Sequence, residues 1–291
     1  MLIVNIIGGL GNQMFQYASI KALSLRRGLR MKIYAGEFEG YSLHAGFELL
    51  RLFELEDDMA TPAKVRAWLG CCSSSFLQKV LAKLHVRACG GLVLEPHHEF
   101  WPGLESIRDD SFLRGYWQSP RYFEDQAVQI RKAFAFVPPL DYASQQIAEQ
   151  MQTGESVSLH IRRGDYLKGW RNRRKFVACP IAYYKQAIEY LRQRFSGLVY
   201  YVFTDDLEWA EKNLHSLTPG IRLVTHNRGE NSYRDMQLMS CAKHNIIANS
   251  TFSWWGAWLN DNAGKIVVAP KQWFANGRST KDLIPGNWVK L

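Results

Sequence analysis

The N-terminal part of the chain changes from the pattern of a strand to that of a helix. The short run at 2–7 is apolar and rich in β-branched residues, which predicts a strand buried on both faces of a parallel sheet. From Met14 to Leu25 apolar residues recur at helical spacing, and Gly28 can end that helix before a second strand at 31–34. The first 34 residues therefore predict a strand, a glycine turn, a helix and a strand.

The second half of the chain alternates strands and helices in the same way. The predicted elements are strands at 157–161, 198–204 and 246–248, and helices at 143–151, from Pro180, at 207–214, at 232–242 and after Ser250. Paired prolines between Phe136 and Tyr142 favour an extended connector. We therefore predict two domains, 1–140 and 141–291, each a Rossmann-like, doubly wound α/β lobe, with a cleft between them.

Composition and charge restrict the class of protein. The 291 residues are 47% hydrophobic and 22% charged, as expected of a globular protein, and the net charge of +9 implies an anionic partner. Nucleic acid, a membrane surface and a phosphorylated substrate all fit that charge. Five cysteines without Cys-x-x-Cys spacing favour a reducing compartment. Because we find neither a basic leader nor a run of about 18 apolar residues, we expect a cytoplasmic location.

The first candidate for chemistry is a glycine-rich turn between the first strand and the first helix. It reads Gly8-Gly9-Leu10-Gly11-Asn12-Gln13. Gly9 and Gly11 allow a ligand to approach the backbone, and the N–H groups of a helix N-terminus attract anions. Met14 stands where a dinucleotide fingerprint has its third glycine, which argues against that fingerprint. A tight turn with Asn12 as the helix N-cap is the alternative interpretation.

A second candidate follows the predicted strand 157–161, at the end where open α/β sheets bind ligands. It reads His160-Ile161-Arg162-Arg163-Gly164-Asp165-Tyr166. Two adjacent arginines beside a histidine predict an anion site, because guanidinium groups bind phosphate oxygens bidentately. A diphosphate suits this arrangement, and a surface ion pair between Arg163 and Asp165 is the alternative.

Polar residues also follow the other predicted strands. Ser250 and Thr251 can cap the next helix or donate to a phosphate, whereas the tryptophans of that helix are expected to pack in the core. Asp205 follows the strand 198–204, and Asp235 precedes the strand 246–248. Either carboxylate can accept hydrogen bonds from guanine, and helix capping is the alternative for both.

Metal ions and nucleic acid are not expected as ligands. The sequence has no Asp-x-Asp triplet to hold a divalent ion against a diphosphate, and His97, His98 and Glu99 suit a surface loop better than a metal site. Residues 162–175 carry seven Lys or Arg and predict a basic loop beside the cleft. The aromatic residues cluster in the apolar helix after Ser250, and no RNA-recognition or helix-turn-helix pattern is evident, so nucleic acid is not the expected partner.

Taken together, these strings resemble the bacterial α1,2-fucosyltransferases of glycosyltransferase family 11. They also share motifs with the wider α1,2, α1,6 and protein O-fucosyltransferase superfamily. The resemblance rests on the strings at 8–18, 115–123, 160–166, 203–206 and 235–258. It implies a GT-B-like fold with the donor site in the cleft. It further implies GDP-β-L-fucose as the donor, no cofactor or metal, and inverting transfer of L-fucose to the 2-hydroxyl of a terminal galactose in an oligosaccharide or surface polysaccharide.

The resemblance also implies roles for individual residues. It makes Arg162 the ligand of the donor β-phosphate and Asp235 the reader of guanine, and it brings Asn12 to the donor from the opposite lobe. The donor-binding residues so predicted are Gly9, Gly11, Asn12, His160, Arg162, Arg163, Asp205, Asp235, Ser250, Thr251 and Phe252. The α1,6 enzymes carry a glutamate shortly after their arginine pair, whereas 167–175 contains no carboxylate. Asp165 is therefore the nearest candidate for a general base alongside Arg162, although it can instead orient Arg163.

Two alternative functions stay open on the sequence. One is a GT-B transferase that uses a different nucleotide sugar, and the other is a non-catalytic protein that binds anions or RNA through the basic run. The expected partners are GDP-fucose and a β-galactoside glycan that can be lipid-linked. A basic face near anionic lipid adds peripheral membrane contact to these expectations.

Overall fold

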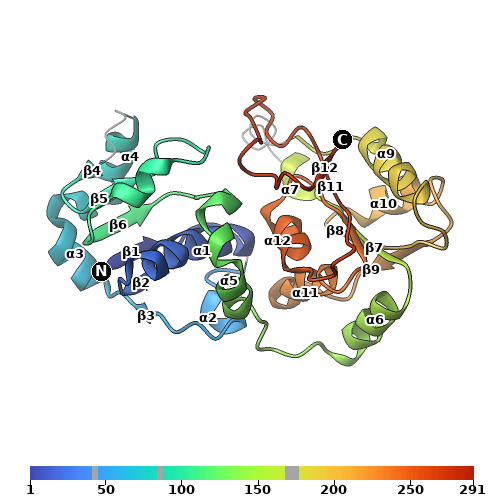
Figure 1. Cartoon of the computed structure of the whole chain (residues 1–291), viewed down its shortest axis with the longest axis horizontal. Coiled ribbons are helices and arrows are strands. Elements are labelled where there is room, and N and C mark those ends of the chain that lie inside the picture. Colours follow the sequence, from blue (N-terminus) through green and yellow to red (C-terminus); the bar gives the residue numbers. More distant parts are fainter. Residues whose placement is uncertain (41–44, 84–87, 168–176) are drawn as a thin grey trace. The chain divides into compact units, whose positions relative to one another are not determined.

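The computed structural model describes residues 1–40, 45–83, 88–167 and 177–291, without the side chains of residues 75, 79, 82, 83, 88, 89 and 165. The chain forms two compact units. Unit 1 contains Met1–Val137 and Lys281–Leu283, and unit 2 contains Pro138–Thr280 and Ile284–Leu291. Each unit is a sheet covered by helices (Figure 1).

Unit 1 is built on a six-stranded sheet in the order β3-β2-β1-β6-β5-β4. Its strands are β1 (Leu2–Asn5), β2 (Met31–Tyr34), β3 (Asp58–Met59), β4 (Ala88–Cys89), β5 (Leu92–Leu94) and β6 (Ser111–Arg114). Neighbouring strands are parallel except for β4 and β5. Its helices are α1 (Leu10–Arg27), α2 (Leu49–Leu52), α3 (Pro62–Leu69), α4 (Ser75–Lys83) and α5 (Ala127–Ala133), with short 3-10 helices at Gly36–Phe38, Gly70–Ser73, Pro102–Ser106, Pro120–Tyr122 and Glu124–Gln126.

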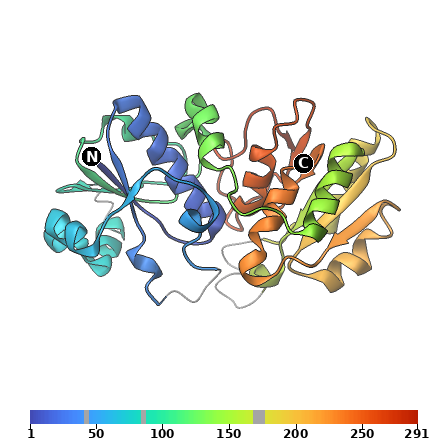
Figure 2. The same cartoon turned by 90° about the horizontal axis from the view of Figure 1, so that it is seen from below.

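Both faces of β1 are covered, which explains why its sequence is apolar throughout. Ile3 packs with Val65 and Leu69 of α3, whereas α1 packs beside β1 and β2. Figure 2 shows α1 and the α3–α4 pair on opposite sides of these strands. Helix α1 ends as predicted, because Gly28 adopts the left-handed conformation with a φ of 60° and its N–H caps the last turn.

Unit 2 is built on a second six-stranded sheet in the order β12-β11-β10-β7-β8-β9, in which neighbouring strands are parallel. Its strands are β7 (Ser156–Ile161), β8 (Val199–Thr204), β9 (Ile221–Val224), β10 (His244–Ile246), β11 (Val267–Ala269) and β12 (Val289–Lys290). Its helices are α6 (Tyr142–Thr153), α7 (Gly164–Leu167), α9 (Ile181–Arg192), α10 (Leu207–Leu214), α11 (Tyr233–Met239) and α12 (Thr251–Leu259), with a 3-10 helix at Gly229–Asn231.

The residues of β8 divide between two hydrophobic clusters, as alternating strand residues must. Tyr200 and Val202 pack with residues of α9 and α10 on one face. Tyr201 and Phe203 pack with residues of α6 and α11 on the other face. This arrangement confirms the doubly wound α/β architecture predicted from the alternation of strands and helices.

Some sequence-based expectations differ from the structure. The strand predicted at 246–248 lies at His244–Ile246, and the strands β9, β11 and β12 were not predicted. The N-cap of α1 is Gly9, so the interpretation of Asn12 as the N-cap is wrong. Cys72 is disulfide-bonded, so the cysteines no longer argue for a reducing compartment. Within the described ranges, each helix is too short or too polar to cross a membrane.

Candidate active site

Three of the predicted motifs meet at one edge of the unit 2 sheet. Strands β8, β7 and β10 are neighbours, and the register pairs Ile161 with Thr204 at the ends of β7 and β8. The carboxyl ends of parallel strands lie at the same edge, which is where such sheets bind ligands. Arg162, Asp205 and Ser250 follow these strands along the chain. The edge therefore combines guanidinium groups, carboxylates and the N-terminus of α12.

Asp205 organises the turn after β7. One of its oxygens, Oδ1, accepts hydrogen bonds from the backbone N–H groups of Arg163 at 2.8 Å and Gly164 at 3.0 Å. Its other oxygen, Oδ2, lies 3.3 Å from Nε of Arg162. A Cβ atom at position 164 would lie 3.1 Å from Oδ2, so glycine allows this close approach. These contacts point to a role for Asp205 in holding the arginine turn, and its predicted role as a guanine reader stays untested.

Arg162 is the cation that this turn presents at the sheet edge. Its side chain is 28% exposed, and its guanidinium group lies over the ring of Tyr166 with 5.9 Å between the guanidinium carbon and the ring centroid. Tyr166 is buried and donates its hydroxyl hydrogen to the carbonyl oxygen of Asn249 at 2.9 Å. This contact joins the arginine turn to the turn that precedes α12. The predicted anion site is thus held from two neighbouring strand ends.

Arg163 is directed toward α10. Its Nε lies 3.3 Å from Asp206 Oδ2, and its guanidinium carbon lies 4.2 Å above the ring of Trp209. Asp206 is also the N-cap of α10, because its side chain accepts a hydrogen bond from the N–H of Trp209. These contacts fully explain Arg163 as a structural residue. Its predicted contact with the donor stays a prediction.

His160 is buried and neutral. Its Nδ1 lies 2.8 Å from the hydroxyl of Ser253, and its ring centroid lies 6.0 Å from that of Phe252. Burial, reinforced by the positive charge of Arg162, lowers the pKa of His160 to about 3. The imidazole therefore carries no charge near neutral pH. It connects β7 to the first turn of α12.

The turn before α12 is a helix cap, as predicted for Ser250. The Ser250 hydroxyl accepts a hydrogen bond from the N–H of Phe252 at 3.3 Å, and Thr251 is the first helical residue. The side chain of Asn249 is buried and donates to the carbonyl oxygens of Val177 and Trp273. The N-terminus of this nine-residue helix adds a partial positive charge beside the arginine turn. Its tryptophans pack in the core as predicted, at positions 254, 255 and 258.

Asp235 lies in the first turn of α11, which packs against α12. The N-cap of α11 is Ser232, so helix capping does not explain Asp235. Its Oδ1 accepts a hydrogen bond from Asn227 Nδ2 at 2.9 Å. Burial raises the pKa of Asp235 to about 7 despite this bond. A half-buried carboxylate with one amide partner suits recognition of a ligand N–H group, which keeps the guanine prediction open.

The glycine turn of unit 1 belongs to the carboxyl end of β1. Gly8 has a φ of 81°, which favours glycine, and Gly9 caps α1 through its backbone. Gly11 and Asn12 lie in the first turn of α1, where the Oδ1 atom of Asn12 accepts a hydrogen bond from Gln118 Nε2 at 2.8 Å. These residues are therefore close together in unit 1. That they share a ligand with Arg162 stays a prediction.

Buried amides hold this turn, and they were not among the predicted site residues. Gln16 donates to the carbonyl oxygen of Ile7 and accepts from its N–H group. Gln13 donates to the carbonyl oxygens of Gly8 and Gly46. Both glutamines are completely buried. Their signal in the sequence is an amide at a core-facing position of an apolar helix, which demands a hydrogen-bond partner.

Two predicted features lie outside the described residues. The side chain of Asp165, the candidate base, is one of them, although its backbone belongs to α7. Residues 168–176, which include most of the basic run, are the other. The alternative ion pair between Arg163 and Asp165 therefore stays untested, and the described partner of Arg163 is Asp206.

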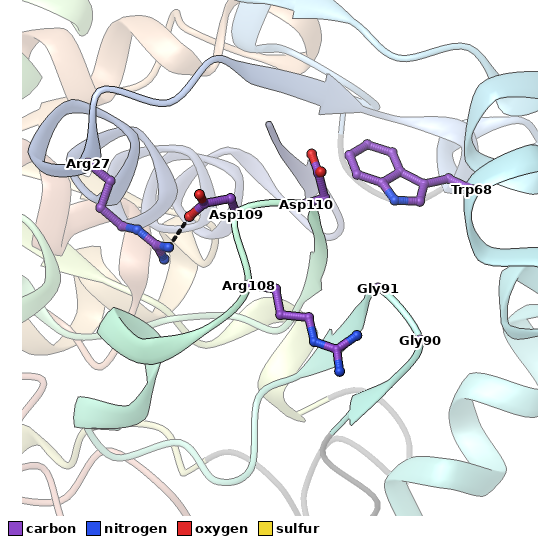
Figure 3. A pocket seen from close by; sticks show the side chains of 7 residues that line it. All are labelled: Arg27, Trp68, Gly90, Gly91, Arg108, Asp109 and Asp110. Atoms are coloured by element: carbon purple, nitrogen blue, oxygen red, sulfur yellow. Dashed lines mark hydrogen bonds and ion pairs between the residues drawn. The ribbon is translucent and has the colours of Figure 1, made fainter.

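Unit 1 has a surface hollow of about 660 Å³ (Figure 3). It lies at the edge of the sheet opposite to the glycine turn. Its lining residues are Arg27, Trp68, Gly90, Gly91, Arg108, Asp109 and Asp110. These residues include those just before β5 and β6, so the hollow faces the amino ends of the strands. Arg27 pairs with Asp109, and Asp110 pairs with the N-terminal ammonium group. Over the described ranges, no group of histidine, cysteine or acidic side chains is arranged to hold a metal ion.

Comparison with known proteins defines the class of this chain. Residues 106–291 match the family described as Glycosyl transferase family 11. An alpha-1,2-colitosyltransferase of Escherichia coli is 32% identical over 292 residues, which cover 100% of this chain and 99% of that protein. The E. coli O-antigen biosynthesis glycosyltransferase WbnK is 32% identical over 98% of each chain. The human galactoside alpha-(1,2)-fucosyltransferase 1 is 26% identical over 87% of this chain and 63% of its own length.

The protein is thus a glycosyltransferase enzyme, and the chain belongs to glycosyltransferase family 11. Solved structures agree with this class at the level of the fold. The fucosyltransferase NodZ from Bradyrhizobium has a TM-score of 0.55 at 14% identity, covering 88% of this chain and 91% of that chain. POFUT1 has a TM-score of 0.51 at 12% identity, covering 91% and 97%. The predicted GT-B-like fold is confirmed, and the alternative of a non-catalytic binding protein is wrong.

Proposed function

We propose that the protein is a galactoside α1,2-L-fucosyltransferase that uses GDP-β-L-fucose without a metal ion. The acceptor is a terminal galactose of an oligosaccharide or a surface polysaccharide repeat unit. The observation that carries the proposal is Arg162, which Asp205 and Tyr166 hold at the carboxyl end of β7 beside the N-terminus of α12. The sequence relatives support it, because they include an α1,2-fucosyltransferase and an O-antigen transferase.

The proposed reaction is a direct displacement at the anomeric carbon of fucose. The acceptor O2 forms a bond to C1 from the face opposite the diphosphate, the bond from C1 to the phosphate oxygen breaks, and the configuration inverts from β to α. Negative charge then builds on the departing GDP. Arg162 and the N-terminal N–H groups of α12 would stabilise that charge, and the loss of one such donor typically costs about 10²–10³ in rate.

The hydroxyl proton of the acceptor needs a base. We assign this role to Asp165, which is separated from the arginine pair by Gly164 alone. Positioned general bases contribute roughly 10²–10⁴ in rate. The Asp165→Asn variant is therefore expected to bind GDP normally and to transfer fucose at least about tenfold more slowly. Turnover close to that of the wild type would remove Asp165 from the mechanism.

Guanine recognition is assigned to Asp235. An ionised carboxylate can accept hydrogen bonds from N1–H and the exocyclic N2–H₂ group of guanine, whereas uracil offers a different hydrogen-bonding edge. The raised pKa of Asp235 fits a carboxylate that awaits such donors, because a ligand N–H group stabilises the ionised form. GDP is therefore expected to bind more tightly than UDP, and this preference is expected to vanish in Asp235→Ala.

Transfer of colitose is the second candidate function. It is favoured by the colitosyltransferase of E. coli, which is 32% identical over the whole of this chain. Colitose is fucose without its 3-hydroxyl group, so a site for one sugar differs from a site for the other by few contacts. A pocket that hydrogen-bonds the 3-hydroxyl would reject the 3-deoxy sugar strongly, whereas an apolar pocket would discriminate weakly.

The decisive test offers GDP-fucose and GDP-colitose separately to the purified protein in EDTA, with lactose and other β-galactosides as acceptors. We expect a fucosylated product whose linkage, determined by NMR, is α1,2. Arg162→Ala is expected to lose the activity, and the matched control Arg194→Ala, at an exposed arginine two residues after α9, is expected to retain it. Transfer from GDP-colitose alone would establish the second candidate. Sedimentation with vesicles that carry anionic lipid tests the proposed peripheral membrane contact.

A further inference from the structure

The segment Gly115–Gln118 forms a tight turn directly after β6 that a single carboxylate holds. Glu95 follows the neighbouring strand β5, whose Leu94 pairs with Arg114 at the end of β6. The two oxygens of Glu95 accept hydrogen bonds from the backbone N–H groups of Tyr116 at 2.7 Å and Trp117 at 2.9 Å. A Cβ atom at position 115 would lie 2.4 Å from the Cβ of Glu95, so only glycine allows the contact.

Trp117 shows that this turn is under strain. Its φ is 52°, and among the described residues no other residue except glycine has a positive φ. Such a conformation is unfavourable for a residue with a side chain and persists only where the surroundings enforce it. The surroundings here are the Glu95 carboxylate on its N–H, the Ser19 hydroxyl on its carbonyl oxygen at 3.1 Å, and a completely buried indole ring. Strain of this kind is concentrated at functional sites.

The turn ends in a contact with the glycine loop of the same unit. Gln118 donates from Nε2 to Oδ1 of Asn12 at 2.8 Å, across 106 positions of sequence. The amide nitrogen of Asn12 lies on the side of Gly8, because a Cβ atom at Gly8 would come within 2.9 Å of Nδ2. Glu95 thus holds the backbone just before Gln118, and Gln118 in turn bonds to the oxygen of the Asn12 amide. In this arrangement the oxygen of that amide faces Gln118 and its nitrogen faces Gly8.

We propose that Glu95 and Gln118 are positioning residues that hold the Asn12 side chain as a hydrogen-bond donor toward the nucleotide sugar. An asparagine whose oxygen accepts a bond from Gln118 turns its N–H₂ group the other way, and phosphate oxygens and sugar oxygens accept bonds from such a group. This inference rests on the proposed function, because it takes Asn12 as a contact of the donor. It extends that function with two residues of unit 1 that act through Asn12.

A double-mutant cycle tests this proposal. Gln118→Leu keeps the approximate volume and removes the donor, and Gln118→Glu keeps the shape but presents only acceptor oxygens at neutral pH. Each is expected to lower kcat/KM for GDP-fucose by about tenfold to a hundredfold, as small misplacements of positioning groups do. The double variant Asn12→Ala with Gln118→Leu is expected to be no slower than Asn12→Ala alone. Gln126→Leu, a glutamine of the same unit that donates to Asp125, is the matched control.

The outcomes separate this proposal from the proposed function. Losses from Asn12→Ala and Gln118→Leu that multiply in the double variant, or a Gln118→Leu enzyme as fast as the wild type, would overturn the positioning role. Wild-type enzyme that transfers no fucose would overturn the proposed function instead. In that case a high-resolution crystal structure of Gln118→Leu decides whether Gln118 positions the Asn12 side chain. An unchanged Asn12 amide refutes this role, and a rotated amide supports it. Glu95→Gln, which loses one of the two N–H acceptors, is expected to disturb the same amide.

Discussion

In unit 2 a carboxylate holds a cation at the end of a strand, whereas in unit 1 neutral amides hold the corresponding turn. The Asp205 carboxylate contacts the Arg162 side chain and accepts hydrogen bonds from the backbone N–H groups of Arg163 and Gly164. The glycine turn before α1 is instead held by Gln13 and Gln16, which bond to the backbone groups of Gly8 and Ile7. Both arrangements lie at the carboxyl ends of parallel strands.

The difference indicates which chemistry each turn can perform. A turn that ends in a guanidinium group attracts a diphosphate over a distance and stabilises charge that develops during reaction. A turn held by neutral amides offers shape and directed hydrogen bonds, which can orient a ligand without adding charge. We therefore expect changes in unit 2 to reduce the rate most, and changes in unit 1 to act through position and stability.

Replacement of Arg162 is expected to have the largest effect. Arg162→Lys keeps the positive charge but loses the fork of N–H donors, which a lysine cannot reproduce at a bidentate site. We expect kcat to fall by about 10²–10³, with the thermal stability of the free protein little changed. Steady-state kinetics with GDP-fucose measure this. A lysine enzyme with nearly normal kcat would mean that simple charge is sufficient there and that the comparison overstates the geometry.

Asp205→Asn is expected to have the next largest effect. The oxygen of the asparagine amide can still accept a hydrogen bond from a backbone N–H group, but the ionic contact with Arg162 is lost. The N–H₂ group of the amide would then face the Arg162 guanidinium group, which is also a donor. We expect kcat/KM to fall by about tenfold to a hundredfold through displacement of Arg162. If Asp205 acts through Arg162, the variant that combines both changes will be no slower than the Arg162 variant alone. Losses that multiply would indicate direct contact of Asp205 with the donor.

Local patterns were sufficient to predict the ends of β7 and β8, whereas β10 lies two residues before its predicted position. The β7 and β8 motifs each combine an apolar strand with polar residues directly after it, and parallel pairing then brings Arg162, Asp205 and Ser250 to one edge. Both faces of these strands are buried, so their sequences carry a strong apolar signal. The short strands β9, β11 and β12 carry a weaker sequence signal. They have only two to four residues each, which is too few to define a hydrophobic period.

The long-range contacts of unit 1 could not be predicted from the sequence. Gln118 was visible within a motif, but its partner Asn12 lies 106 positions away, and the Glu95 partner of the same turn follows a three-residue strand. Neither contact leaves a periodic pattern. The contacts of Asp205 with the arginine turn were missed for a similar reason, because an aspartate at a strand end can serve a ligand, a helix cap or a neighbouring loop. The structure shows that it holds the arginine turn.

The pH dependence of donor binding sharpens the comparison further. Burial raises the pKa of Asp235 to about 7, and guanine requires its ionised form, so the Kd for GDP-fucose is expected to rise up to about tenfold per pH unit below 7. The free protein shows the opposite sign. That sign belongs to the Asp235 contribution to stability, which favours the protonated acid and is expected to fall as the pH rises from about 4 to about 7. Titration calorimetry measures the first effect and thermal melts the second.

Asp235→Asn is the control for both measurements. It is expected to bind GDP-fucose more weakly, with a flat profile, and to lose the pH dependence of stability that Asp235 causes. GDP-fucose is preferred to GDP as the probe, because a terminal phosphate titrates with a pKa near 6 and would obscure the result. In the folded protein His160 does not titrate in this range, since burial lowers its pKa to about 3, and its own contribution to stability is common to both proteins and cancels in the comparison. If the Kd for GDP-fucose still depends on pH in Asp235→Asn, the result would point to Glu95, because burial raises the pKa of Glu95 to about 7.

Gln16→Leu is expected to have the smallest effect on transfer and a clear effect on stability. Gln16 is completely buried and satisfies both backbone groups of Ile7, so leucine leaves a donor and an acceptor unpaired in the core. Each costs about 1–3 kcal/mol, which predicts a lower Tm but nearly normal kcat well below that temperature. Gln145→Leu, on the exposed face of α6, controls for the loss of an amide. A stable but inactive Gln16→Leu enzyme would mean that this amide serves the substrate directly, and the distinction between a reactive turn and a supporting turn would fail.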